Sequence, residues 1–380
     1  MAYGFTRIVR RGLLAIPFLA IGHICTLMMN PDKMESTRLP MMNTGRISWD
    51  GGSIPILDTF YHNDFLDSTW KHLTVLFSPS ALGYDPVSWW AGLSFSQNLG
   101  TLYAIWMVDS HRDGNKSSPA SLPVIFTLFG NLIGAGTAGP WFFFLCFTFG
   151  NNWMTEKEKK PSTAATRGLN DTGARFMLPI MLLFHTFEIS MGYFASTPET
   201  RHFFTWTWEF LPLWAGLTDA LLSRLLRRAR NSSSPSSSSS GLGCLVLKAH
   251  RIMPQIEIQV VFMALISGVT WAWMVFFAPY SLGEILLPPK VAHGSRWFDQ
   301  EGLIAHSRLV MQVDNLCTFG ASFLALGFEL ADLYAAGLLK SGTIFEMAAV
   351  FPIVVAMLGP GAGLVFAWIW KERHMKVPVE

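Results

Sequence analysis

Two pairs of ionisable residues lie near the middle of apolar stretches of this 380-residue chain. The stretch 177–194 is apolar enough to cross a bilayer, yet it carries His185 and Glu188. A later apolar stretch carries Glu329 and Asp332 at the same i, i+3 spacing, which places both members of a pair on one helix face. An ionisable group at that depth is costly, so it usually faces the interior of a helix bundle. The two pairs therefore predict a proton-handling cavity inside the membrane.

These side chains suit acid–base chemistry. Burial favours the neutral form of a carboxylic acid, and a neutral acid can donate a proton. We expect Glu188 or Glu329 to be the proton donor, with His185 or Asp332 orienting the donor or removing a proton. The alternative is that these groups only form hydrogen bonds between helices and specify their packing. Further acidic candidates are Glu209, Asp219, Asp314, Asp64 and Asp67.

No motif for a metal or a nucleotide cofactor accompanies these acids. The sequence contains no CxxC, HExxH or Cys/His cluster, no aspartate-rich motif for magnesium and diphosphate, and no Gly-rich phosphate loop. We therefore expect chemistry without a metal or a cofactor. The net charge of +2 gives no reason to expect a nucleic-acid partner. Aromatic side chains that could stabilise a cation include Trp206, Trp208, Trp271 and Trp273.

The composition predicts an all-α, polytopic integral membrane protein. Hydrophobic residues make up 51% of the chain and charged residues 14%, whereas soluble domains carry about a quarter charged residues. Eight stretches approach the twenty or so apolar residues that a bilayer crossing needs. We expect them to be transmembrane helices of a single domain, with the endoplasmic reticulum as the membrane. They cover residues 13–29, 86–109, 121–149, 177–196, 203–222, 257–279, 310–336 and 344–370.

The segments between these stretches differ in character. The long segment 30–85 mixes polar and apolar residues, so we expect it to lie along the membrane interface and cap a cavity. The loop 224–256 contains a serine-rich linker at 231–241, which is expected to be disordered. Pro140 is expected to kink the stretch 121–149. Three sequons allow glycosylation, at Asn115, Asn170 and Asn231.

The chain resembles the fungal membrane-bound terpene cyclases of the ascofuranone and ascochlorin pathways. The resemblance rests on the chain length, the eight apolar stretches, the segment YHNDFLDSTWKHLTVLFSPS before the second of them, and the acids inside later stretches. It covers nearly the whole chain. It implies a metal-independent, proton-initiated cyclisation of an epoxyfarnesyl tail on a polyketide-derived aromatic, which is an isomerase reaction of meroterpenoid biosynthesis.

Two other functions would use the same residues. A proton-coupled exporter of a secondary metabolite also needs buried acids, but it should show internal repeats. A non-catalytic membrane scaffold would pair its buried acids with one another. The expected partners are a prenylated aromatic molecule and the lipid bilayer.

Overall fold

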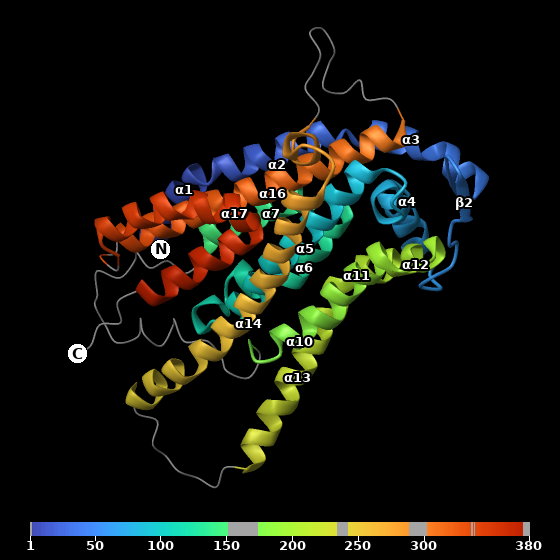
Figure 1. Ribbon diagram of the computed structural model, residues 1–380. Helices are drawn as coiled ribbons and strands as arrows, with labels where there is room; N and C mark the ends of the chain where they lie inside the picture. The colour runs from blue at the N-terminus through green and yellow to red at the C-terminus, as the bar shows by residue number, and fades with distance from the viewer. Residues whose placement is uncertain are drawn as a thin grey trace.

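The computed structural model describes residues 2–150, 174–233, 242–288, 302–335, 337 and 339–374, and this part of the chain is almost entirely helical (Figure 1). One two-stranded antiparallel hairpin interrupts the helices near the N-terminus. The first elements are α1 (Ala2–Leu14), α2 (Ile16–Met29), α3 (Pro31–Thr44), β1 (Arg46–Trp49), β2 (Gly52–Pro55), α4 (Asp64–Ala81), α5 (Pro86–Ser110), α6 (Pro123–Ile133) and α7 (Ala135–Phe149). The later elements are α10 (Met177–Met181), a π-helical turn (Leu182–Thr186), α11 (Phe187–Phe194), α12 (Pro198–Glu209), α13 (Leu211–Ser233), α14 (Leu242–Phe277), α15 (Leu282–Leu286), α16 (Leu303–Ala335) and α17 (Ser341–His374).

The helix α5 is the centre of the bundle, although its sequence is only moderately apolar. It packs against α4, α14, α16 and α17, and most of its residues are buried (Figure 1). Its Asn98 accepts hydrogen bonds from Ser267 Oγ and from the backbone N–H of Gly361, both at 2.8 Å. The second bond exists because α17 breaks at Gly359, whose φ of 85° favours glycine. The polar side chains of α5 therefore join helices inside the bundle.

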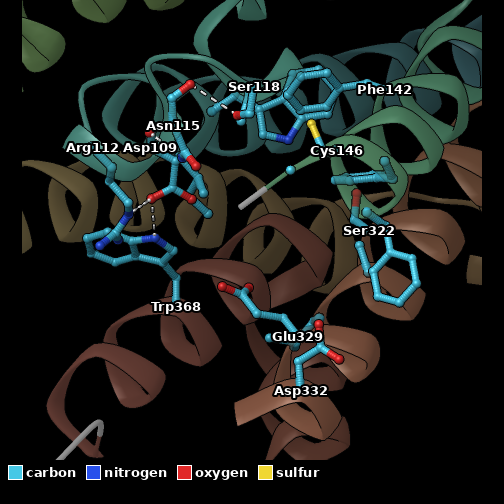
Figure 2. Close-up of a pocket in the computed structure, with 18 of the residues that line it drawn as sticks. Asp109, Arg112, Asn115, Ser118, Phe142, Cys146, Ser322, Glu329, Asp332 and Trp368 are labelled. Atoms are coloured by element: carbon cyan, nitrogen blue, oxygen red, sulfur yellow. Dashed lines mark hydrogen bonds and ion pairs between the residues drawn. The ribbon is translucent and has the colours of Figure 1, made fainter. Parts of the chain in front are cut away.

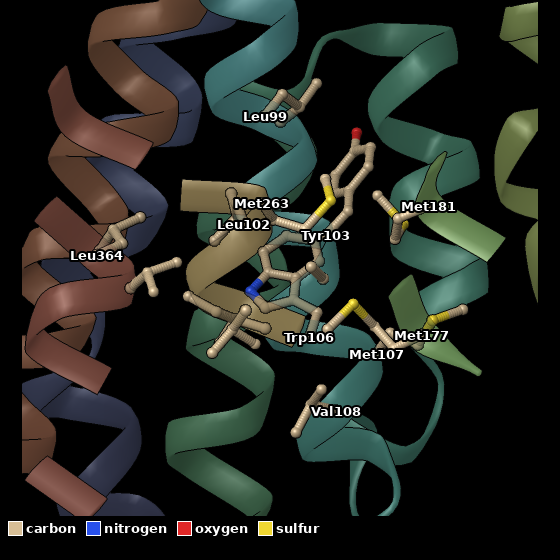
Figure 3. Packing of buried hydrophobic residues seen from close by; sticks show 14 of the residues in the cluster. Leu99, Leu102, Tyr103, Trp106, Met107, Val108, Met177, Met181, Met263 and Leu364 are labelled. Atoms are coloured by element: carbon tan, nitrogen blue, oxygen red, sulfur yellow. The ribbon is translucent and has the colours of Figure 1, made fainter. Parts of the chain in front are cut away.

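The largest buried apolar cluster surrounds the second half of α5 (Figure 3). Trp106 lies at its centre, and methionines from neighbouring helices fill the space around it, among them Met181 and Met263. Methionine has an unbranched, flexible side chain that adapts to irregular gaps. This cluster holds α7, α10, α14 and α17 around α5 and so fixes the helices that carry the polar residues described below.

Within the described residues, four helical segments are long and apolar enough to cross a membrane: Met177–Phe194, Met253–Phe277, Leu303–Ala335 and Ser341–His374. A fifth arises if Phe5–Leu14 and Ile16–Thr44, bent by 45°, count as one crossing. The all-α membrane architecture expected from the sequence thus agrees with the structure, but eight crossings are not confirmed. The difference has a physical cause, because α5 carries many polar residues and two other expected stretches are broken.

The stretch 121–149 breaks at Gly134, between α6 and α7, and not at Pro140 as expected. Gly134 has a φ of 91°, which ends α6 and begins α7 in a new direction. Pro140 lies inside α7. The stretch 203–222 breaks at Phe210, between α12 and α13. Of the expected loop 224–256, residues 224–233 belong to α13 and residues 242–256 to α14. Residues 234–241 of the serine-rich linker lie outside the described residues, so the disorder expected there stays a prediction.

Residues 30–85 form α3, the hairpin and α4, which lie against α16 and α12 at one end of the bundle (Figure 1). The turn before α4 is organised by Asp67, whose carboxylate accepts hydrogen bonds from the backbone N–H groups of Phe60, Tyr61 and Asn63. Burial alone would raise the pKa of Asp67, but these three bonds outweigh it and lower the pKa below its ordinary value. Asp67 is therefore a structural acid.

The same turn rests on α12 through His202. The Nε2 atom of His202 accepts hydrogen bonds from the backbone N–H of Leu57 and from Trp206 Nε1, both at 3.3 Å. These bonds require a neutral ring, and burial lowers the pKa of His202 from 6.5 to about 4. The folded state therefore binds a proton less readily than the unfolded state. As a result, the free energy of unfolding decreases as the pH falls from the pKa of the unfolded state towards that of the folded state.

We predict that the contact between the turn and α12 weakens as the pH falls from about 6.5 to about 4, by roughly 3 kcal/mol in total. Hydrogen exchange of the Leu57 amide over this pH range measures the effect. Replacement of His202 by Gln, which keeps an acceptor but does not titrate, should remove most of the pH dependence. An unchanged pH dependence in that variant would assign the effect to another group.

Candidate functional site

An apolar cavity of about 340 Å³ lies between α4, α5, the α6–α7 junction, α11, α12 and α16. Its walls are mainly aliphatic and aromatic, and they include Phe77, Phe95 and Phe204. Three carboxyl groups from three different helices also line it, namely Glu188 of α11, Glu209 of α12 and Asp314 of α16. We call this space the carboxyl cavity. Apolar walls with a few converging polar groups are typical of small-molecule sites.

Asp314 is held by the start of α7. Its carboxylate accepts hydrogen bonds from the backbone N–H of Gly136 at 2.5 Å and of Ala135 at 3.3 Å. These N–H groups are free because α7 begins there, and the helix dipole adds a favourable field for an anion. A side chain at Gly136 would place a Cβ 2.7 Å from the Asp314 carbonyl oxygen, so glycine permits this close approach. Asp314 therefore has the surroundings of a carboxylate.

Glu188 and Glu209 have different surroundings. Among the described residues, neither oxygen of Glu209 has a hydrogen-bond partner, and Oε2 of Glu188 has none. Glu209 is completely buried and Glu188 is 9% exposed. Glu209 is also the last residue of α12, where the helix dipole disfavours a negative charge. Burial without a partner favours the neutral acid, which can donate a hydrogen bond to a bound molecule.

His185 lies in the π-helical turn that precedes Glu188. Its Nε2 atom is 3.0 Å from the carbonyl oxygen of Ser96, and its Nδ1 atom accepts a hydrogen bond from Trp208 Nε1 at 3.3 Å. Both ring nitrogens are thus used, and the ring packs directly against Gly100. The structure does not pair His185 with Glu188, so His185 fixes the turn that presents Glu188 to the carboxyl cavity.

The second expected pair lies in a different cavity, of about 460 Å³, between α1, α5, α7, α16 and α17 (Figure 2). Glu329 accepts a hydrogen bond from Lys371 at 2.8 Å, and Asp332 pairs with Arg11 at 2.9 Å. We call this space the ion-pair cavity. The two pairs predicted from the sequence are therefore not brought together, and Glu329 and Asp332 have ionic partners that Glu188 lacks.

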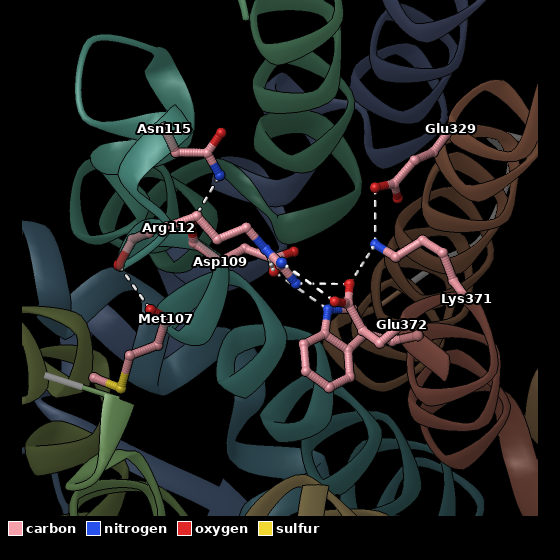
Figure 4. A network of polar contacts seen from close by, with 9 residues as sticks. Met107, Asp109, Arg112, Asn115, Glu329, Lys371 and Glu372 are labelled. Atoms are coloured by element: carbon pink, nitrogen blue, oxygen red, sulfur yellow. Dashed lines mark hydrogen bonds and ion pairs between the residues drawn. The ribbon is translucent and has the colours of Figure 1, made fainter. Parts of the chain in front are cut away.

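A buried network continues from Lys371 (Figure 4). Glu372 accepts from Arg112 at 2.7 Å and lies 3.4 Å from Lys371, and Arg112 also pairs with Asp109 at 2.7 Å. The eight expected transmembrane stretches contain no Lys or Arg, so their sequences alone do not predict this network. The position of Lys371 and Glu372 at the end of an apolar helix was the available indication.

The remaining candidates are structural or untested. Asp219 pairs with His111 at 3.0 Å, and Asp64 begins α4. Asn115 donates a hydrogen bond to the carbonyl oxygen of Asp109, and it lines the ion-pair cavity. The sequon at Asn170 and the side chain of Asn231 lie outside the described residues. Within the part that the structure describes, no group of three or more His, Cys, Asp or Glu could hold a metal ion.

Comparison with known proteins defines the family. The CtvD domain matches residues 43–375, so the chain belongs to the CtvD-domain family. The chain is 25% identical over 365 residues to the FAD-dependent monooxygenase verC1 of Penicillium polonicum, covering 96% of this chain and 42% of that protein. It is 23% identical over 330 residues to the FAD-dependent monooxygenase anuJ of Penicillium roqueforti, covering 84% of this chain and 36% of that protein. No solved structure matches.

These findings confirm the family suspected from the sequence and correct the activity. Both relatives are fungal proteins named as monooxygenases, which are oxidoreductases, so the expected terpene cyclase and its isomerase class are not supported. The exporter is not supported either. The chain spans less than half the length of the curated relatives it matches.

The described residues do not fit FAD. A dinucleotide usually rests its pyrophosphate on a Gly-rich turn between a strand and a helix of a βαβ unit. In the described ranges the only strands are those of the β1–β2 hairpin. The cations of the ion-pair cavity are already bound to carboxylates, and the lining of the carboxyl cavity includes no Lys or Arg that could balance a pyrophosphate. The described residues therefore form no recognisable flavin site.

Proposed function

We propose that this chain is the membrane-embedded, substrate-binding part of a flavin-dependent monooxygenase system. The chain would hold an apolar, oxygen-bearing molecule in the carboxyl cavity, while the flavin is carried by a domain or protein outside the described residues. The observation that carries the proposal is the combination of relatives named as FAD-dependent monooxygenases with an apolar cavity, and no flavin fold, in the described residues of this chain.

The cavity defines how such a molecule would bind. Its apolar body would contact Phe77, Phe95 and Phe204, and its oxygen atoms would accept hydrogen bonds from Glu188 and Glu209. A hydroxyl group on the molecule could donate to Asp314. The prenylated aromatic expected from the resemblance is one molecule of this class. Eight membrane crossings and residence in the endoplasmic reticulum are part of this proposal.

Photolabelling tests the binding site. The full chain in lipid nanodiscs would be irradiated with a photoreactive farnesol analogue, which combines an apolar chain with one hydroxyl group. We expect saturable labelling of α4 near Phe77 and of α12 near Phe204, competed by free farnesol. Labelling confined to lipid-facing positions of α14, such as Ile258 and Val269, would contradict the assignment.

The link to oxygenation is tested separately in verC1. Deletion of the region that matches this chain should leave the remainder able to bind FAD, because the described residues of this chain form no recognisable flavin site. The truncated protein should still oxidise a reduced nicotinamide cofactor but release peroxide instead of oxygenating the substrate of verC1. Loss of FAD from the correctly folded remainder would show that the shared part holds the flavin.

A further inference from the structure

The ion-pair cavity has two unlike halves. Aromatic and aliphatic side chains from α2, α5 and α7 form one half, including Phe18, Trp106 and Phe142. The other half carries charged side chains, which are Asp109, Arg112, Glu329 and Asp332 (Figure 2) together with Arg11 and Lys371. A molecule that fills this space must therefore be amphiphilic, with an apolar body and a polar head.

The charged side chains of the second half determine which kind of polar head group the cavity can bind. Three cations lie there, and each is already bound to a carboxylate: Arg11 to Asp332, Arg112 to Asp109 and Glu372, and Lys371 to Glu329 and Glu372. The charges that line the cavity balance, with Arg11, Arg112 and Lys371 on one side and Asp109, Glu329 and Asp332 on the other. An anionic head would have to draw one of these cations away from its carboxylate, whereas a cationic head needs only a carboxylate with an exposed oxygen atom.

Glu329 is the carboxylate of this network that can bind a further hydrogen-bond donor. One of its oxygens binds Lys371, and its side chain remains 36% exposed, the largest exposure among the acids of this network. Figure 2 shows its carboxyl group directed into the space opposite Phe142 and Cys146. The aromatic walls add favourable cation–π interactions, as Arg11 already shows by lying 3.8 Å from the centroid of Phe147.

We propose that the ion-pair cavity is a second binding site, which takes an amphiphile with an apolar body and a cationic amine head bound to Glu329. The site is separate from the carboxyl cavity and does not depend on the monooxygenase proposal. The amine can come from a lipid headgroup or from a free metabolite.

Binding of three probes with the same alkyl chain tests the site: dodecylamine, dodecanol and dodecyl phosphate. With the full chain in phosphatidylcholine nanodiscs and protein-free nanodiscs as the blank, dodecylamine should bind tightest and dodecyl phosphate weakest. Glu329→Gln should weaken the binding of dodecylamine roughly ten- to hundredfold, because a charge-assisted hydrogen bond is lost. Lys371 keeps Glu372 in this variant, so the network survives.

Two further variants keep the test decisive. Glu346→Gln, at an exposed position of α17 outside both cavities, should leave dodecylamine binding unchanged. Ala325→Phe, which places a large side chain in the ion-pair cavity, should abolish it. Equal or tighter binding of dodecyl phosphate, or equal losses in Glu329→Gln and Glu346→Gln, would overturn the proposal. Competition by phosphatidylethanolamine in the nanodisc would identify a lipid amine as the source, and its absence a free amine.

Discussion

Replacement of Arg112 by Met should lower the free energy of unfolding by about 3–5 kcal/mol, because it leaves the buried carboxylate of Glu372 and the half-buried carboxylate of Asp109 without their main cation. Arg112 binds Asp109 and Glu372, both at 2.7 Å, and its side chain is only 7% exposed. Burial alone would lower the pKa of Arg112, but the two carboxylates outweigh it and raise the pKa above its ordinary value. Met removes the charge, the hydrogen bonds and the cation–π contact with Trp368, whose ring centroid lies 5.7 Å from the guanidinium carbon.

The matched control is Lys116→Met. Lys116 pairs with Asp113 at 2.7 Å, but both side chains are exposed, at 65% and 38%. An exposed pair of this kind contributes about 1 kcal/mol or less. Urea unfolding in detergent, followed by circular dichroism, measures both variants. Similar small losses for Arg112→Met and Lys116→Met would show that water reaches the network around Arg112.

The bounds of a helix could be predicted from the sequence where capping residues mark them. The expected stretch 86–109 and α5 (Pro86–Ser110) nearly coincide, since Asp85 caps the helix and Pro86 begins it. The broken helices could not be predicted in the same way. Gly134 and Gly359 lie in apolar stretches whose sequence does not indicate a break. Only the structure shows that each adopts a positive φ.

The candidate sites, too, could be predicted from the sequence only in part. Of the residues singled out by their spacing, Glu188 lines one cavity, and Glu329 and Asp332 line another. The spacing could not reveal their partners, because Arg11 lies 321 positions from Asp332 and the N–H groups that hold Asp314 come from α7. The resemblance led to the right family but to the wrong activity, since a shared membrane domain does not determine the reaction of the whole protein.

The acids of the carboxyl cavity should respond to substitution in opposite directions. Glu209 is fully buried and has no hydrogen-bond partner among the described residues, so it costs folding free energy. We predict that Glu209→Met, which keeps the length of the side chain, raises the free energy of unfolding by about 1–3 kcal/mol. Asp314→Leu should lower it by roughly 2–4 kcal/mol, because two buried N–H groups lose their acceptor.

Measuring ligand binding distinguishes a role of Glu209 in the binding site from an effect on packing alone. If Glu209 donates a hydrogen bond to the bound molecule, the more stable Glu209→Met variant should bind the photoreactive farnesol analogue roughly three- to tenfold more weakly. Thermal unfolding without ligand and labelling with increasing probe concentration measure the two effects on the same nanodisc samples. If Glu209 instead stabilised the fold, Glu209→Met would lower the free energy of unfolding. Destabilisation by Glu209→Met together with undiminished labelling would exclude Glu209 from the binding site, because removing a hydrogen-bond donor to the ligand must weaken binding.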